Sequence, residues 1–180
     1  MSVFTMPANG QIISVIQGEY AVSDQPDAVM TTVLGSCISA CLYDPVRQVG
    51  GMNHFLLPEA QSGSGKDVKY GAYLMELLIN TLLKKGAARQ RLRAKLAGGA
   101  QMSRFLSGVG SQNIDFALRY LQNEGIAIDW QSLGGSQARR IHFVPTTGQL
   151  SEKFVRNDDQ IDAPRDRIPR TRIKPDIELF

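Results

Sequence analysis

The sequence has little sulfur and little histidine: its 180 residues include two cysteines, two histidines and one tryptophan. The cysteines, Cys37 and Cys41, stand four residues apart. In a strand their Cα atoms would lie about 13 Å apart, at roughly 3.3 Å per residue. A disulfide needs Cα atoms within about 7 Å of each other. We therefore expect two free thiols and a reducing compartment, which excludes a disulfide-stabilised secreted domain.

Long apolar runs and a strong charge of one sign are also absent. No apolar stretch has the length of a membrane span, and residues 1–10 lack the basic start and apolar run of a signal peptide. The net charge of +3 is too small to indicate a nucleic-acid-binding face. We expect a cytoplasmic protein that neither inserts into membranes nor binds nucleic acid.

What is present is an ordinary globular composition, with 43% hydrophobic and 21% charged residues. Runs of apolar and β-branched residues predict seven or eight strands, and two stretches have helical spacing. The predicted strands cover 12–16, 29–34, 38–43, 49–57, 92–97, 126–130, 140–144 and 150–155. The predicted helices run from about 70 to 86 and from an N-cap at Ser111 to 125. Strands clustered at both ends predict a layered α/β sandwich of mixed sheets with two main helices, not a doubly wound parallel sheet.

The composition changes near the C-terminal end. Residues 157–180 carry charges of both signs and three prolines, with few apolar residues. We expect residues 1–156 to form the α/β domain and residues 157–180 to form an extended or disordered tail. The Ser/Gly-rich stretch 61–67 predicts a loop.

The most informative stretch runs from Thr31 to His54. Cys37 follows a short turn, and His54 lies on the next predicted strand, so two neighbouring strands can bring the thiol and the imidazole together. A cysteine beside an imidazole is the minimal device for covalent attack on a carbonyl carbon. A third group must orient the ring, and Thr31 or Thr32 on the preceding strand can offer a hydroxyl or a carbonyl.

The turn before the cysteine consists of Gly35 and Ser36. Glycine tolerates unusual backbone angles, so the N–H groups of residues 35–37 could point at a developing oxyanion. Removing one such donor typically costs about 2.7 to 4 kcal/mol of barrier height.

Other interpretations of these residues remain open. A cysteine in an apolar strand is often a small buried hydrophobe, and Cys41 fits that role better than Cys37. His142 has the character of a structural or surface residue. A zinc site built from the two cysteines and two histidines has no familiar spacing, and Gly98-Gly99 lacks a phosphate-binding pattern. We therefore predict neither a metal nor a cofactor.

Several blocks, in order along the chain, resemble the chemoreceptor glutamine deamidase family, CheD, of bacterial chemotaxis. The resemblance extends over roughly residues 12–155. The blocks are Thr31 to Cys37 with a following strand and Asp44-Pro45, then 51–58, Lys69-Tyr70, 94–100 and 134–139. One departure is Gln112, which stands where the family commonly has arginine before the second helix.

The resemblance implies a cofactor-independent amidohydrolase that acts on linear amides. Its catalytic residues would be Cys37, His54 and Thr31, and the candidates for substrate or oxyanion binding are Gly35, Ser36, Gly98 and Gly99. The implied reaction converts protein glutamine side chains to glutamate through a cysteine thioester and releases ammonia; hydrolysis of glutamate methyl esters is a second implied activity. The implied fold is an α/β sandwich related to toxin-type deamidases.

The implied substrates are the cytoplasmic helical regions of methyl-accepting chemoreceptors. A CheC-type phosphatase is a possible further partner. The alternative to an enzyme is an adaptor that binds the receptor or the phosphatase and has little catalysis.

Overall fold

The computed structural model describes residues 10–57, 66–102 and 108–155. The elements in chain order are β1 (Gln11–Ser14), β2 (Tyr20–Ser23), β3 (Ala28–Leu34), β4 (Ile38–Asp44), β5 (Val49–Asn53), α1 (Lys66–Lys84), η2 (Arg89–Arg91), β6 (Arg93–Gly98), α2 (Val109–Asn123), β7 (Ala127–Leu133), β8 (Arg139–Phe143) and β9 (Leu150–Phe154). The strands form a four-stranded sheet of order β1-β3-β8-β9 and a five-stranded sheet of order β2-β5-β4-β6-β7. Both sheets are mixed, because β1 is parallel to β3 and β6 is parallel to β7, whereas the other pairs are antiparallel.

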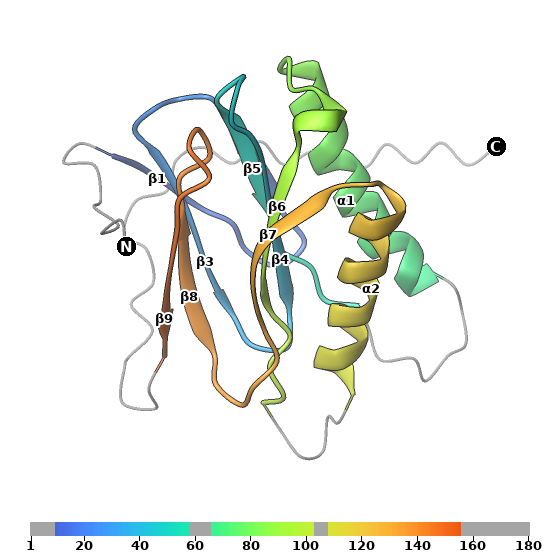
Figure 1. Cartoon of the computed structure of the whole chain (residues 1–180). Helices are drawn as coiled ribbons and strands as arrows, with labels where there is room; N and C mark the ends of the chain where they lie inside the picture. The colour runs from blue at the N-terminus through green and yellow to red at the C-terminus, as the bar shows by residue number, and fades with distance from the viewer. Residues whose placement is uncertain (1–9, 58–65, 103–107, 156–180) are drawn as a thin grey trace.

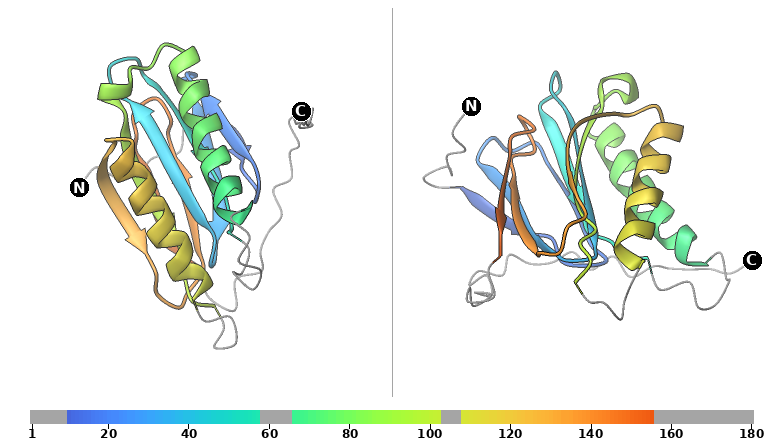
Figure 2. Two further views of the ribbon diagram at one scale, coloured as in Figure 1. Left: turned by 90° about the vertical axis from the view of Figure 1, so that its right-hand side faces the viewer. Right: turned by 60° about the horizontal axis from the view of Figure 1, so that its bottom comes forward.

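Three layers make up the molecule. The five-stranded sheet lies in the middle, with α1 and α2 side by side on one face and the four-stranded sheet on the other (Figures 1 and 2). This arrangement confirms the predicted layered α/β sandwich with two main helices.

Strand β4 shows how the sequence produces these layers. All seven of its residues are buried, and side chains alternate between the two faces of a strand. Ile38 and Leu42 pack in the core beneath the helices. Cys41 and Tyr43 pack in the second core, between the two sheets. A strand buried on both faces needs the nearly continuous apolar run that the sequence shows.

Three expected boundaries are wrong. Helix α1 already begins at Lys66, inside the stretch predicted to be a loop. Helix α2 is capped by Gly108, whose φ of 103° suits glycine, and Ser111 instead lies in the first turn and donates its hydroxyl to the Gly108 carbonyl. The strand predicted for 49–57 ends at Asn53, followed by an isolated bridge at Phe55.

The described chain has one strand more than the upper expectation of eight. The additional element is β2, which pairs with the edge of the five-stranded sheet through β5. The remaining loop residues 61–65 and the predicted tail at 157–180 lie outside the described residues.

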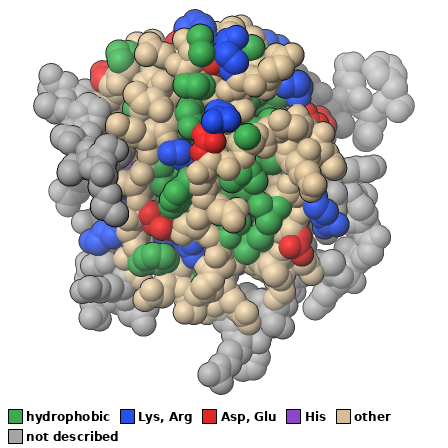
Figure 3. Space-filling model, in the orientation of Figure 1, with side chains coloured by type: hydrophobic (Ala, Val, Ile, Leu, Met, Phe, Trp, Pro, Cys, Tyr) green, Lys and Arg blue, Asp and Glu red, His purple; other side chains and the backbone are tan. Residues whose placement is uncertain are grey.

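On the face shown in Figure 3, basic and acidic side chains are interspersed and do not gather into separate patches. Within the described ranges, neither helix is long and apolar enough to cross a membrane.

Candidate active site

The turn between β3 and β4 lies at the lower end of the molecule in Figure 1, close to the end of β6 and the start of α2. Cys37 is the last residue of this turn. The next residue, Ile38, exchanges two backbone hydrogen bonds of 2.9 Å with Phe55. In this antiparallel register Cys37 and His54 are diagonal neighbours on the same face, and the Cβ atoms of such pairs lie about 7 Å apart. The register thus places the predicted nucleophile and the predicted base on neighbouring segments and on the same face.

The His54 side chain is buried and anchored through one ring nitrogen. Its Nδ1 lies 2.8 Å from the Thr32 hydroxyl oxygen and 3.3 Å from the Val15 carbonyl oxygen. A carbonyl can only accept a hydrogen bond, so the contact with Val15 favours the tautomer with the proton on Nδ1. Nε2 then carries a lone pair, and it has no hydrogen-bond partner among the described residues. This tautomer is the one that a general base needs.

The two threonines of β3 have different contacts. The Thr32 hydroxyl reaches the imidazole, whereas the Thr31 hydroxyl donates to the carbonyl of Ile141 on β8 at 2.9 Å. Of the two residues that could orient the ring, Thr32 is the one that touches it. Thr31 instead joins β3 to β8.

The Cys37 thiol is half-buried, and its Sγ lies 3.6 Å from the Gln17 side-chain oxygen, to which it donates. Burial raises the pKa of Cys37, although its own backbone N–H partly offsets this effect. Burial also lowers the pKa of His54, against the opposing influence of Val15 and the charge of Glu19. Both shifts favour neutral groups. These directions favour a neutral thiol and a neutral imidazole over an ion pair.

Backbone contacts to the end of β6 fix the turn. The N–H of Gly99 donates to the Cys37 carbonyl, and the N–H of Ala100 donates to the Gly35 carbonyl, each at 2.8 Å. Gly98 has φ of 115°, and a Cβ there would collide with the Cys37 carbonyl oxygen. Gly98 and Gly99 therefore lie against the cysteine's backbone, and the N–H of Gly99 is already engaged.

Asn113 on α2 connects the two segments of the site. Its side chain is fully buried. The amide nitrogen donates to the Ser36 carbonyl at 2.9 Å, and the amide oxygen accepts from the Leu57 N–H at 2.8 Å. One side chain thus ties the turn that carries Cys37 to the segment that follows His54.

The other cysteine and histidine lie apart from this chemistry. Cys41 is fully buried in the core between the sheets, and burial raises its pKa to about 12. His142 lies on β8, opposite Thr31 in the strand register. No group of three or more His, Cys, Asp or Glu side chains that could hold a metal occurs within residues 10–57, 66–102 and 108–155.

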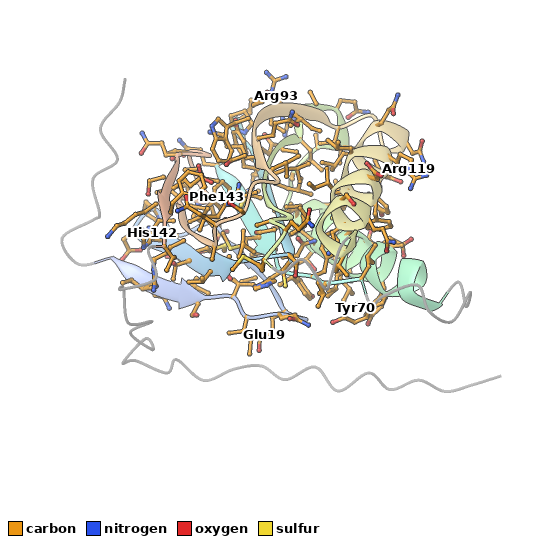
Figure 4. All side chains as sticks on the ribbon, turned by 90° about the horizontal axis from the view of Figure 1, so that it is seen from below. Glu19, Tyr70, Arg93, Arg119, His142 and Phe143 are labelled. Atoms are coloured by element: carbon orange, nitrogen blue, oxygen red, sulfur yellow. The ribbon has the colours of Figure 1, made fainter. Side chains whose placement is uncertain are left out.

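Two residues of the site escaped the sequence reasoning. Asn113 follows the unusual Gln112 in a block that resembles the family, so its place in that block was a usable signal. Gln17 carried no signal, because its proximity to Cys37 depends on the path of the connection between β1 and β2. Figure 4 shows Glu19, two residues further along, near Tyr70 on one border of this end of the molecule.

A family model described as "CheD chemotactic sensory transduction" matches residues 56–153. That match begins after Cys37 and His54, but relatives in full-length comparison extend across both. A probable chemoreceptor glutamine deamidase CheD of Caulobacter sp. (strain K31) is 51% identical over 175 residues, covering 93% of this chain and 92% of the relative. The protein of the same name from Agrobacterium fabrum (strain C58) is 52% identical over 148 residues, covering 82% of each chain.

Among solved structures, a Bacillus licheniformis hypothetical protein, YfiH, aligns with a TM-score of 0.45 and 14% identity, covering 63% of this chain and 49% of that one. The extent of the family match and the identity to the Caulobacter and Agrobacterium proteins show the family of this chain without help from the solved structures. The chain belongs to the CheD family.

Proposed function

We propose that this protein hydrolyses glutamine side chains of methyl-accepting chemoreceptors to glutamate, with Cys37 as nucleophile and His54 as base. The observation that carries the proposal is the unpartnered Nε2 of a buried, oriented imidazole on the same strand face as the thiol. The curated relatives, named as probable chemoreceptor glutamine deamidases, supply the reaction class and the substrate. The cytoplasm, where those receptor regions lie, is the corresponding location.

The reaction begins with a neutral pair. As the sulfur attacks the amide carbon, the thiol proton moves to Nε2 of His54, which avoids a free thiolate in the resting enzyme. The resulting imidazolium is stabilised by the Thr32 oxygen and the Val15 carbonyl at Nδ1 and by the charge of Glu19. The C–N bond then breaks, and His54 returns the proton to the departing ammonia. Water, activated by the same nitrogen, hydrolyses the thioester and restores the thiol.

The developing oxyanion needs hydrogen-bond donors in the turn. Among the described residues, no backbone carbonyl accepts from the N–H groups of Ser36 and Cys37. These two groups are therefore our proposed donors, and Gly35, in the same turn, packs against Met102. Gly98 and Gly99 act in this proposal as the wall that holds the turn in place. Thr31 acts through β3, by keeping Thr32 in position.

The surroundings of the turn suit a partly apolar protein substrate. Met102 is 53% exposed and lies over Gly35. Tyr70 is 40% exposed, and its hydroxyl lies where a Cβ on Gly18 would come within 2.8 Å. These side chains offer apolar contact on two sides of Cys37 for a receptor helix. Hydrolysis of a methyl ester would use the same steps, with methanol leaving in place of ammonia. A CheC-type phosphatase stays a predicted partner.

The test is mass spectrometry of a receptor cytoplasmic fragment incubated with the enzyme. The wild-type protein should convert specific glutamines to glutamate, and Cys37→Ala should abolish the conversion. Cys41→Ala is the matched control, because it removes the other thiol, and it should retain activity. Deamidation by Cys37→Ala at the wild-type rate would disprove the mechanism.

The adaptor alternative makes the opposite prediction in cells. If binding alone sufficed, Cys37→Ala would restore chemotaxis fully in a deletion strain. We expect it to bind the receptor fragment but fail to restore chemotaxis.

A further inference from the structure

A glutamine of this chain already lies at the nucleophile. The thiol of Cys37 donates to the side-chain oxygen of Gln17, with 3.6 Å between sulfur and oxygen. Gln17 is exposed, so no packing forces its carboxamide onto the sulfur. The contact therefore places at Cys37 the functional group that the proposed reaction hydrolyses.

The backbone around Gln17 is held by the same strands that carry the site. Val15 donates its N–H to the Thr31 carbonyl at 3.0 Å, and Gly18 donates to the His54 carbonyl at 2.8 Å. The N–H of His54 in turn donates to the Glu19 carbonyl at 3.0 Å. These hydrogen bonds fix the backbone on both sides of Gln17 against β3 and the segment that carries His54.

We propose that Gln17 is an intramolecular substrate of Cys37 and is deamidated to glutamate within the same chain. The inference rests on the proposed function, because it uses the same nucleophile and base. A group held next to its nucleophile reacts with a high effective concentration, so one slow turnover can occur without a receptor. The buried, unpartnered Nε2 of His54 supplies the base.

The steps balance without a further reactant. The Cys37 sulfur forms a bond to Cδ of Gln17 while its proton moves to His54 Nε2. The Cδ–N bond breaks, and the nitrogen leaves as ammonia with that proton. Water then adds to the thioester carbon, the S–C bond breaks, and the sulfur regains a proton. The net change is glutamine plus water to glutamate plus ammonia.

The product differs from the starting state in charge. A glutamate at position 17 places a carboxylate beside the thiol, close to the existing charge of Glu19. A nearby negative charge disfavours the thiolate and raises the pKa of a thiol. Self-deamidation would therefore slow the enzyme, and the modified form should react less readily at Cys37.

The experiment is peptide mapping by mass spectrometry of the full chain, at purification and after incubation at neutral pH. Wild-type protein should carry glutamate at position 17 in a fraction that grows with time, whereas Cys37→Ala should retain glutamine. Three further exposed glutamines, Gln11, Gln25 and Gln48, are internal controls and should not change. Cys41→Ala should behave as wild type. An unchanged Gln17 in wild type, or equal conversion in Cys37→Ala, overturns the inference.

A receptor fragment in the same tubes separates the two proposals. Receptor deamidation with an unchanged Gln17 removes the inference and leaves the proposed function standing. Conversion of Gln17 without receptor deamidation supports the inference and rejects the receptor as the substrate. No conversion of either glutamine removes both.

A second measurement uses variants and does not depend on the turnover. Alkylation of Cys37 should be about tenfold slower in Gln17→Glu than in wild type, the effect of a one-unit rise in thiol pKa. Gln17→Ala, which removes the contact without adding charge, should react at least as fast as wild type. Equal rates in Gln17→Glu and wild type would contradict the predicted effect of the product.

Discussion

The two ends of strand β4 differ in how fully their buried polar groups are hydrogen-bonded. At its C-terminal end, the fully buried carboxylate of Asp44 accepts hydrogen bonds from the N–H groups of Val46, Arg47 and Ala88 and from the Arg91 guanidinium. Burial alone would raise the pKa of Asp44, but these hydrogen bonds outweigh it and lower the pKa to about 2. At the N-terminal end, just before the strand, burial raises the pKa of Cys37, and Nε2 of His54, on the neighbouring segment, is buried without a partner in the described structure.

The difference separates a structural polar site from a reactive one. Buried polar groups are normally satisfied, because an unpaired donor or acceptor costs free energy. Asp44 follows that rule with a complete set of donors. His54 departs from it at one atom, the atom that a base must leave open to its proton. The same strand thus joins a fully bonded polar site at one end to a site with an unpartnered ring nitrogen at the other.

Thiol reactivity should give the largest contrast. Cys37 is half-buried, whereas Cys41 is fully buried with its pKa raised to about 12. We expect iodoacetamide to alkylate Cys37 at least about a hundredfold faster than Cys41 in the folded protein. Because burial raises the pKa of Cys37 above its usual value of 9.0, the rate should still be rising beyond that pH. Equal labelling of the two thiols would refute the contrast, and a plateau near neutral pH would indicate an ion pair with His54.

Removing the charge of Asp44, at the C-terminal end of β4, should lower the stability of the fold. Asp44→Asn loses charge-assisted hydrogen bonds in a buried position, and we expect the free energy of unfolding to fall by about 2 to 3 kcal/mol. Chemical denaturation measures this loss. Asp24→Asn is the matched control, since Asp24 makes partly exposed ion pairs, and should cost less than about 1 kcal/mol.

The pH dependence of stability follows from the same carboxylate. The pKa of Asp44 is lower in the folded protein, about 2, than its ordinary value of 3.8. Its contribution is therefore complete above the ordinary value and is lost as the pH falls from 3.8 toward about 2. Asp44→Asn should flatten this part of the acid unfolding curve. An unchanged curve would show that other carboxylates dominate acid unfolding.

Loss of the Thr32 hydroxyl, which contacts the His54 ring, should have an intermediate effect. Thr32→Val removes the hydroxyl that contacts Nδ1, and a hydrogen bond worth about 1 to 1.5 kcal/mol corresponds to roughly a tenfold loss of kcat. KM should change little. Thr31→Val is the matched comparison. It should lower the stability of the fold but leave the tautomer of the His54 imidazole, which nitrogen NMR can follow, largely unchanged. A larger loss of kcat in Thr31→Val than in Thr32→Val would reverse the assignment of the two threonines.

The smallest effect is expected on the exposed face of α2. Gln112 is exposed, so Gln112→Arg should change the free energy of unfolding by less than about 0.5 kcal/mol and leave kcat unchanged. If this position contacts the receptor, KM for a receptor fragment should shift severalfold. Gln122→Arg, at the exposed far end of the same helix, is the control and should leave KM unchanged.

The predictable and unpredictable parts of the site differ in what they depend on. Cys37 and His54 could be proposed from the sequence because Cys37 borders one apolar run and His54 lies within another, and neighbouring runs tend to pair. The residues alone left Thr31 and Thr32 both open and the resemblance implied Thr31, whereas the contact with the ring depends on which face of β3 meets the other sheet. The side chain of Asn113 bonds to Leu57 and Ser36, which stand 56 and 77 positions earlier in the chain. Such contacts follow from packing and leave no local pattern.

The amino-acid sequence alone determined the alternation of strands and helices, the layered class of the fold and the residue types that the proposed chemistry uses. These properties follow from side-chain period and composition, which are local. Only the tertiary structure decided that burial favours the neutral thiol and imidazole, that Nε2 of His54 has no partner among the described residues and that Gln17 lies against Cys37. Protonation and contact depend on burial and on neighbours distant in the chain, and those exist only once the layers have packed.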